Sequence, residues 1–544
     1  MSTPHMSPGR ASRAARPLSL ALVASTLAWV GAAAPAEAAP PSCSKRTNNT
    51  YAKLLECVTV EGVRAHQAVF QSIADANDDE YYPGSRVAGT EGYAKSVDYV
   101  AGKLRAAGYT VTLDPFEFQF VFPALLRQTG PVTASYATGT YTGSGNGTVS
   151  GGVVPIDLAL LPPRASTSAC EATDFTGIDL SGPSDIALIQ RGTCPFGVKA
   201  ANAQAAGAEA VVIFNDGASP AREGLIVGTL VPSVVTIPVV GASFADGVTL
   251  AQPGSTGQVR VLPSETRTDY NVIAEKRGTY RDNVVMSGAH LDSVGAGPGI
   301  NDNGSGSAAL LETALQMAKV KPVNTVRYAW WGAEESGLLG STAYVQGLSQ
   351  AEKDRIALYL NYDMVGSPNY VLTIYDADTS TFPAPAGVPI PEGSAAIEAL
   401  YEGFYTSVGQ PYDDAQYSGR SDYQAFILAG IPSGGLFTGA EGVKTAAQQA
   451  VWGGTAGAQY DPCYHLACDT YANNNNAALD VNSDLIAYAA LTYAYSTEPV
   501  NGVVGEPVPE SVPLPAPAGP EGTFCTTAGC PSGGLHDDHE SESE

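Results

Sequence analysis

After residue 265 the chain alternates between short, continuous apolar stretches and longer stretches in which apolar residues recur every three or four positions. The first pattern predicts buried strands at residues 283–290, 325–335 and 356–365. The second predicts helices at residues 305–320, 341–348, 395–407, 422–428 and 484–495. Strands and helices that alternate in this way form a mostly parallel sheet covered by helices on both faces, which indicates the α/β class.

The pattern before residue 130 extends the same unit. Residues 51–76 and 92–107 have helical spacing, and residues 109–113 are expected to form an edge strand of the α/β sheet. Residues 130–262 differ, because Gly, Ser, Thr, Val and Pro dominate and short strands are separated by turns. We therefore expect a β-rich insertion that divides one α/β domain into residues 43–129 and 263–498.

Both ends of the chain differ from these domains. Residues 1–38 contain three arginines, then an apolar stretch from residue 18 to 34, then small residues up to Ala38. This order is typical of a secretory signal peptide cleaved after Ala38, and the apolar stretch is too short for a retained membrane anchor. Residues 499–544 are Pro-rich and then acidic, which predicts a disordered tail. We expect an exported protein in which the tail could be trimmed.

The cysteines support export. The mature chain has eight, an even number, which favours disulfides in an oxidising compartment. Two of the close pairs have a C-x4-C spacing that also occurs in zinc sites, and the sequence does not fix connectivity. Our hypothesis joins the neighbours, as Cys43–Cys57, Cys170–Cys194, Cys463–Cys468 and Cys525–Cys530.

The charge limits the partners. Lys and Arg total 28 against 54 Asp and Glu, so the net charge of −26 argues against nucleic acid and anionic membrane surfaces. An acidic surface is otherwise expected to keep an exported protein in solution. Oligomeric state cannot be read from this composition.

Candidate chemistry lies where the predicted strands end. Two of the chain's six histidines and several acidic residues fall in Gly-bounded turns at these places: His290, Asp302, Glu335, Asp363 and His465. Imidazoles suit zinc and carboxylates can bridge two cations, so this set fits two zinc ions better than calcium or magnesium. A water shared by two zinc ions has its pKa lowered towards about 7, which makes a hydroxide available at neutral pH.

Two further acids have separate roles. Asp292 lies two positions after His290, so in an extended chain it points the same way and can orient the imidazole. Glu334 and Glu335 are adjacent and project differently, so Glu335 can bind metal while Glu334 accepts a proton from the water and delivers it to the leaving group.

The segments SGAHLDSV, GINDNGSG, WWGAEESGLLGS, NYDMVGS, SGRSDYQAF and DPCYHLACDTY resemble the secreted two-zinc aminopeptidases similar to aminopeptidase Y, which are related to glutamate carboxypeptidase II. The run IALIQRGTCPFGVKAANAQAAGAEAVVIFND, residues 186–216, resembles a protease-associated domain, which could shape access, bind partners or cover the site.

The resemblance assigns roles to single residues. It implies that Asp302 bridges the metals, that His290 and Asp363 complete one zinc, and that Glu335 and His465 complete the other. Glu334 becomes the general base and acid, with Asp292 as the second catalytic residue. Tyr464 matches a tyrosine that stabilises the oxyanion, with packing beside the disulfide loop as the alternative. Arg420 is either a substrate contact or a salt-bridge partner of Asp422 or another acid. Asp480 and Asp484 match a calcium site, with helix capping as the alternative.

The function that we expect is an exported zinc aminopeptidase that removes apolar, Leu-like N-terminal residues from peptides and proteins with a free N-terminus. One alternative is another reaction on the same scaffold, such as a carboxypeptidase, which would need a cluster of arginines, or a glutaminyl cyclase, which uses a single zinc. A non-catalytic binding protein would require lost ligands, and every ligand position is filled here.

Overall fold

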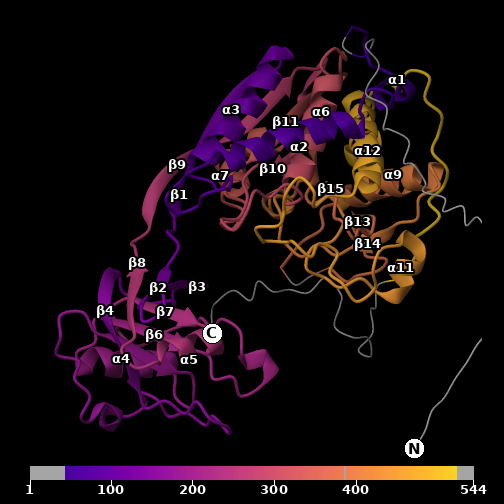
Figure 1. Cartoon of the computed structure of the whole chain (residues 1–544). Coiled ribbons are helices and arrows are strands. Elements are labelled where there is room, and N and C mark those ends of the chain that lie inside the picture. The colour runs from indigo at the N-terminus through magenta and orange to yellow at the C-terminus, as the bar shows by residue number, and fades with distance from the viewer. Residues whose placement is uncertain (1–42, 44, 385–386, 524–544) are drawn as a thin grey trace, which may run out of the picture. The chain divides into compact units, whose positions relative to one another are not determined.

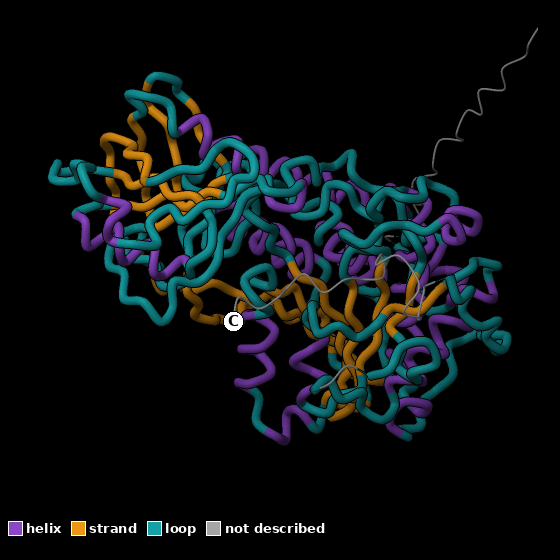
Figure 2. The backbone as a smooth tube through the Cα atoms, turned by 90° about the horizontal axis from the view of Figure 1, so that it is seen from below, coloured by secondary structure: helices purple, strands orange, loops and turns teal. Residues whose placement is uncertain are grey.

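A computed structural model of the 544-residue chain describes residue 43, residues 45–384 and residues 387–523. Within these residues the strands form one eight-stranded and one seven-stranded sheet (Figures 1 and 2). The order in the eight-stranded sheet is β1 (Thr110–Phe120), β9 (Glu265–Lys276), β11 (Asn324–Trp331), β10 (Tyr280–His290), β12 (Ile356–Tyr362), β15 (Ser433–Phe437), β13 (Thr373–Tyr375) and β14 (Asp413–Ala415).

The centre of this sheet is parallel, as the alternating pattern predicts. Strands β11, β10, β12 and β15 run parallel, whereas β9 pairs antiparallel with β1 and β11, and β13 pairs antiparallel with β15. Strand β10 ends at His290 and β1 lies at the sheet edge, as expected, but β1 extends to Phe120. The sheet is therefore of the mixed α/β type with a parallel core.

Each face of the sheet has its own hydrophobic core, because successive side chains of a strand point to opposite faces. Tyr328 and Trp330 pack into one core, and Ala329 and Trp331 pack into the other. Figure 1 shows α2, α3 and α6 over the first face. The helices on this face are α1 (Tyr51–Leu55), α2 (Val60–Asp75), α3 (Glu91–Ala106), α6 (Gly304–Gln316), α9 (Ser394–Ser407) and α12 (Asn476–Tyr495).

The second face is covered by α7 (Leu339–Gly347) and α10 (Tyr423–Leu428), which contact each other. Three short helices lie in connections: α8 (Gln350–Lys353), α11 (Ala446–Trp452) and α13 (Glu498–Asn501). Helix α12 begins eight residues before the start that apolar spacing indicates, because Asn475 caps its first turn by accepting from the amides of Ala477 and Ala478. Both faces of the sheet are thus covered by helices.

The strands of the seven-stranded sheet are inserted in the sequence between β1 and β9, two neighbouring strands of the eight-stranded sheet. Its order is β3 (Ala134–Tyr136), β2 (Leu125–Gly130), β8 (Thr256–Val261), β4 (Gly147–Ile156), β5 (Ile186–Gln190), β6 (Ala210–Phe214) and β7 (Val239–Ala242). Helices α4 (Phe196–Ala206) and α5 (Phe244–Leu250) pack against its two separate cores. The insertion expected at residues 130–262 therefore includes β2 as well.

The Pro-rich segment after α13 is ordered up to the last described residue, whereas its composition predicts disorder from residue 499 onwards. Part of it packs against α9 and the residues that follow α9. The amide of Ala518 donates to Thr406 Oγ1 at 3.0 Å, and the amide of Glu521 donates to the Tyr412 carbonyl at 2.9 Å. Such backbone hydrogen bonds compensate for the weak hydrophobicity of the segment. The correction applies to residues 499–523, because the rest of the tail lies outside the described residues.

The residues that the structure describes form three disulfides, each between neighbouring cysteines that the sequence paired: Cys43–Cys57, Cys170–Cys194 and Cys463–Cys468. The pair Cys525–Cys530 and the signal peptide expected at residues 1–38 lie outside the described residues. A search of the described helices finds none with the length and apolar character needed to span a membrane.

Candidate metal centre

The five expected metal ligands converge at one edge of the eight-stranded sheet. His290 is the last residue of β10, Asp363 follows β12 directly, and Asp302 lies two residues before α6. Glu335 lies on the loop after β11, and His465 on a loop closer to the C-terminus. Since β10, β11 and β12 are adjacent parallel strands, their carboxyl ends meet where ligands bind in open α/β sheets.

The donor atoms form two groups that share Asp302. His290 Nε2 lies 3.2 Å from Asp302 Oδ1 and 3.2 Å from Asp363 Oδ1. His465 Nε2 lies 3.2 Å from the other oxygen of Asp302, Oδ2, and 3.1 Å from Glu335 Oε2. Asp302 therefore directs one carboxylate oxygen to each group.

This arrangement fits zinc ions. Two ligand atoms that each lie 2.0–2.1 Å from one tetrahedral zinc are separated by roughly 3.3 Å, which matches the donor separations here. The buried atoms His290 Nδ1 and Glu335 Oε1 have no hydrogen-bond partner among the described residues. An unpartnered buried carboxylate oxygen at the centre of the group is what a missing cation would leave. The residues His290, Asp302, Glu335, Asp363 and His465 can hold a pair of zinc ions.

The histidines and carboxylates of the site shift one another's pKa values. Burial alone would lower the pKa of His465, but hydrogen bonds to Asp302 and Glu335 raise it to about 10. Burial would raise the pKa of Asp302, but the hydrogen bonds from His290 and His465 lower it. Burial raises the pKa of Glu335 to about 7, with Asp302 adding to the shift.

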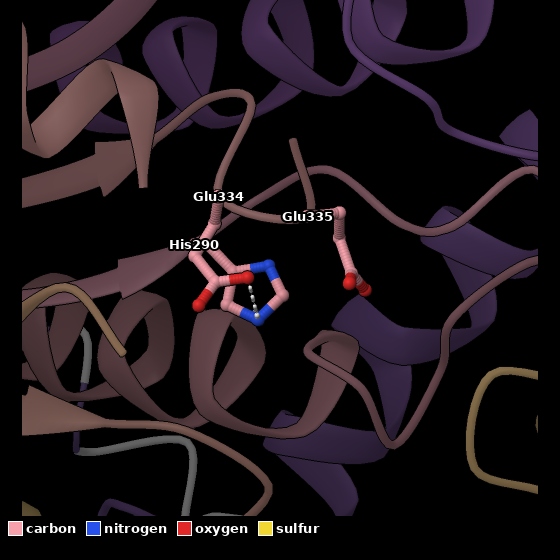
Figure 3. A group of neighbouring side chains, drawn as sticks. All are labelled: His290, Glu334 and Glu335. Carbon is pink, nitrogen blue, oxygen red and sulfur yellow. Dashed lines mark ion pairs between the residues drawn. The ribbon is translucent and has the colours of Figure 1, made fainter. Parts of the chain in front are cut away.

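The two adjacent glutamates have different surroundings. Figure 3 shows the Glu334 carboxylate against the His290 ring and the Glu335 carboxylate on another side of it. Glu334 Oε2 lies 3.9 Å from His290 Nε2, and burial raises the pKa of Glu334 well above its usual value. Its position beside His290 suits Glu334 to a role as proton acceptor.

Asp292 connects these groups. Its Oδ1 lies 3.6 Å from His290 Nδ1 and accepts from the amide of Glu334 at 3.2 Å, while its Oδ2 accepts from the amide of Glu335 at 3.3 Å. One carboxylate therefore faces the imidazole and also fixes the backbone that carries both glutamates.

The backbone is left-handed at three places in this site. Ala333, Met364 and His465 have φ values of 52°, 50° and 56°. Such values are uncommon for residues other than glycine and cost of order 1–3 kcal/mol each, so they persist where surrounding contacts hold them. Here they turn the chain directly before Glu334, directly after Asp363 and at His465 itself.

Two buried residues that the sequence did not single out support the ligand loops. The Asp469 carboxylate accepts from the amides of Asn301 and Asp302, each at 2.9 Å. Arg86, which is completely buried, donates to the carbonyls of Leu291, Pro298 and Gly299 on the loop after His290. Their partners are backbone atoms far away along the chain, and no local pattern signals such contacts.

Tyr464 and Arg420 lie together in the pocket over the metal ligands. Arg420 Nη2 donates to the Tyr464 hydroxyl at 3.1 Å, and Arg420 Nη1 lies 2.6 Å from Glu441 Oε1. Glu441 is thus an ion-pair partner of Arg420, and the alternative partner Asp422 is itself buried. Because the Tyr464 oxygen accepts from Arg420, its own proton remains available for another acceptor.

The pocket has a volume of about 450 Å³ and joins the metal ligands to an apolar wall. Asp302, Glu334, Glu335, Asp363 and His465 form its floor together with Tyr464. The wall includes the apolar and aromatic residues Leu338, Met364, Tyr375 and Phe437. A cavity of this size and lining accommodates an apolar side chain.

Asp480 and Asp484 lie inside α12, one turn apart. Because Asn475 caps this helix, capping does not explain them. Burial raises the pKa of Asp484 to about 7, and Asp480 adds to the shift. The two belong to none of the groups of three or more donors found in the described part of the chain.

The loop closed by Cys463–Cys468 carries both Tyr464 and His465. We expect the double variant Cys463→Ser/Cys468→Ser to bind zinc and turn over substrate about 10- to 100-fold less well, as when supports of a metal ligand are removed. Zinc retention after dialysis and kcat/KM measure the effect. The matched variant Cys170→Ser/Cys194→Ser removes the disulfide of the inserted sheet and should change neither quantity. Equal values for both double variants would contradict this role of the loop.

Comparison with known proteins identifies the family of both sheets. Residues 271–490 match the model of peptidase family M28, and residues 149–250 match the PA domain. An aminopeptidase of Pseudomonas aeruginosa is 47% identical over 459 residues, which cover 82% of this chain and 83% of the relative. The leucine aminopeptidase 2 of Trichophyton equinum is 39% identical over 447 residues, which cover 81% of this chain and 85% of that relative. A solved zinc aminopeptidase from Bacillus subtilis has a TM-score of 0.55 and 25% identity, with coverages of 80% and 95%.

Proposed function

The chain belongs to peptidase family M28 and is a zinc-dependent aminopeptidase with an inserted PA domain, and from this premise we propose that it is exported, holds two zinc ions and removes apolar N-terminal residues. The observation that carries the proposal is the shared position of Asp302, whose two oxygens each lie 3.2 Å from a different histidine. One carboxylate between two imidazoles fits a bridging ligand.

In this proposal His290 and Asp363 complete one metal position, and Glu335 and His465 complete the other. When bound, zinc supplies a Lewis acid that polarises the scissile carbonyl and lowers the pKa of a water. Glu334 accepts the proton of that water and delivers it to the leaving amine. Asp292 is a positioning residue, because it acts through His290 and the amides of Glu334 and Glu335.

The pocket explains the choice of substrate. The apolar wall formed by Leu338, Met364, Tyr375 and Phe437 suits an apolar side chain, and Glu334 and Asp363 can pair with a free α-amine. A carboxypeptidase for acidic residues would need several arginines, and Arg420 is the one arginine among the described residues that line the pocket. Since Arg420 is engaged by Glu441 and Tyr464, we assign it to positioning Tyr464.

The direct test compares leucyl, glutamyl and N-acetyl-leucyl anilides with the purified zinc-loaded protein. We expect rapid release from leucyl anilide, slower release from glutamyl anilide and none from the blocked substrate, with all turnover lost on chelation. Release from the blocked anilide would rule out an aminopeptidase, and turnover that resists chelation would rule out the metal.

Two smaller proposals accompany this function. We propose that residues 1–38 are removed during export, which N-terminal sequencing of the protein from the medium tests; an N-terminus before Ala38 would contradict it. We also propose Asp480 and Asp484 as a calcium position, because they place two carboxylates on successive turns of α12.

Replacement of Tyr464 by Phe is expected to lower kcat about 10²- to 10³-fold, because the hydroxyl donates to the oxyanion in the transition state. KM and zinc content should stay within a few-fold of the wild-type values. Tyr471→Phe is the matched control, since the Tyr471 ring packs under Arg64 and lies outside the pocket. If Arg420 acts through Tyr464, adding Arg420→Lys to Tyr464→Phe should cost little more. Fully additive losses would contradict this coupling.

A further inference from the structure

A second group of carboxylates lies away from the zinc ligands, where β13, α9 and β14 meet. We call Asp376, Asp378, Glu398, Glu402 and Asp414 the acidic cluster. Asp376, Asp378 and Glu398 offer oxygens within 4.8 Å of one another, and so do Glu398, Glu402 and Asp414. Glu398 belongs to both groups, so the cluster is continuous.

No basic side chain offsets these charges. Residues 356–419 contain no Lys, Arg or His, and no ion pair between described residues involves the acidic cluster. Asp376, Glu398 and Asp414 are buried, with exposures of 2%, 3% and 0%. Burial raises the pKa of Glu398 to about 9 and that of Asp414 to about 7, with neighbouring acids adding to both shifts. Buried carboxylates without a counter-charge are costly, and they are normally paired or bound to a metal.

An unpartnered buried atom points to what is missing. Asp414 Oδ1 has no hydrogen-bond partner among the residues that the structure describes, although Asp414 is completely buried and its Oδ2 accepts from the Thr381 hydroxyl. Buried acceptors in folded proteins are rarely left unsatisfied, so this oxygen points to a partner outside the polypeptide. This atom belongs to a side chain that contributes to the acidic cluster.

Backbone amides hold Asp376, Asp378 and Glu398 in place. Glu398 Oε2 accepts from the amides of Ala377 at 2.9 Å and Asp378 at 2.8 Å, so these bonds leave its second oxygen for another partner. Asp376 Oδ1 accepts from the amide of Ser380 at 3.0 Å. The oxygens are therefore preorganised, which reduces the cost of gathering like charges around an ion.

We propose that the acidic cluster binds a calcium ion. All its donors are hard carboxylate oxygens, whereas zinc prefers nitrogen and sulfur. Calcium–oxygen distances of 2.3–2.6 Å allow ligand oxygens on opposite sides of the ion to lie up to about 5 Å apart, which agrees with separations within 4.8 Å. Magnesium demands a tighter octahedron, and a loop, a helix and a strand that each supply donors suit the more flexible coordination of calcium.

The ion would also support the substrate pocket. Tyr375, which directly precedes Asp376, and Gln416, two residues after Asp414, both line the pocket. Calcium would tie the ends of β13 and β14 to α9 and so hold this wall. This consequence rests on the proposed function, whereas calcium binding itself does not.

The test uses the full mature chain, freed of divalent ions on a chelating resin and reloaded with zinc, and titrates it with calcium or magnesium chloride. Calorimetry should show calcium binding that is at least tenfold tighter than magnesium binding. At calcium concentrations about 100 times Kd, the thermal midpoint should rise by about 3 °C or more. In Glu398→Gln and Asp414→Asn the calcium-dependent rise should disappear.

Asp480→Asn/Asp484→Asn is the matched control, because it removes the other calcium position and leaves the acidic cluster intact. One calcium site and the thermal rise should persist in it. If the variants at the buried positions fail to fold, Glu402→Gln replaces them, because Glu402 is partly exposed. This variant should weaken calcium binding at least tenfold. The proposal is overturned if calcium has no effect on the wild-type chain, or if the effect survives in the cluster variants. Calcium affinity and the thermal midpoint are measured without substrate. Their outcome therefore does not depend on whether the protein cleaves leucyl anilide.

Discussion

Glu334→Gln is expected to lower kcat for leucyl anilide by about 10⁴-fold, at the upper end of what general acid–base catalysis contributes, while the protein keeps its zinc. Glutamine has nearly the same shape but can neither accept the proton of the attacking water nor return it to the leaving amine. Glu334 is 8% exposed, and its carboxylate lies 3.9 Å from His290 Nε2, beside the expected metal ligands.

The adjacent residue provides the matched comparison. Glu335 Oε2 lies 3.1 Å from His465 Nε2 and its Oε1 has no partner, so Glu335→Gln should lose zinc as well as activity. Measuring kcat and bound zinc for both variants separates proton transfer from metal binding. Glu334→Gln with more than a tenth of wild-type kcat, or with its zinc lost, would exclude the assigned role.

Asp302→Asn should abolish zinc binding at both metal positions. Asparagine presents an NH₂ group in place of one of the two oxygens that face His290 and His465, and an NH₂ group cannot serve as a metal ligand. We expect dialysis to remove both zinc ions and kcat/KM to fall at least about 10³-fold, which corresponds to roughly 4 kcal/mol of transition-state stabilisation.

Asp269→Asn is the control for a buried aspartate outside the metal centre. Asp269 is 6% exposed and accepts from the amides of Gly89 and Tyr270, so its replacement tests the general cost of such a change. It should keep two zinc ions and most of the activity. If Asp302→Asn retained one zinc ion at full occupancy, Asp302 could not be the ligand that both metal positions share.

Three of the expected metal ligands could be placed from the sequence because His290, Asp302 and Asp363 lie next to strongly patterned elements. The apolar stretch of β10 ends at His290, and that of β12 ends one residue before Asp363. Glu334 and Glu335 were expected at the end of a strand, but β11 stops at Trp331. The left-handed backbone at Ala333 turns the chain away from the sheet, and no side-chain pattern signals such a turn.

Other features had no local signal. Arg86 and Asp469 act on backbone atoms of loops that come together only in the folded chain. Strands β13 and β14 have three residues each, too few to show a period of two, so the acidic cluster at their ends could not be recognised as one group. The packing of residues 505–523 depends on polar partners in and after α9, whereas their composition alone indicates disorder.

The central claim is that five side chains from separate parts of the chain hold a pair of zinc ions. X-ray data collected on crystals of the zinc-loaded protein above and below the zinc absorption edge test it most directly. The account predicts two anomalous peaks roughly 3.5–4 Å apart, with Asp302 between them, His290 and Asp363 on one and Glu335 and His465 on the other. A single peak, or peaks bound by other residues, would contradict it.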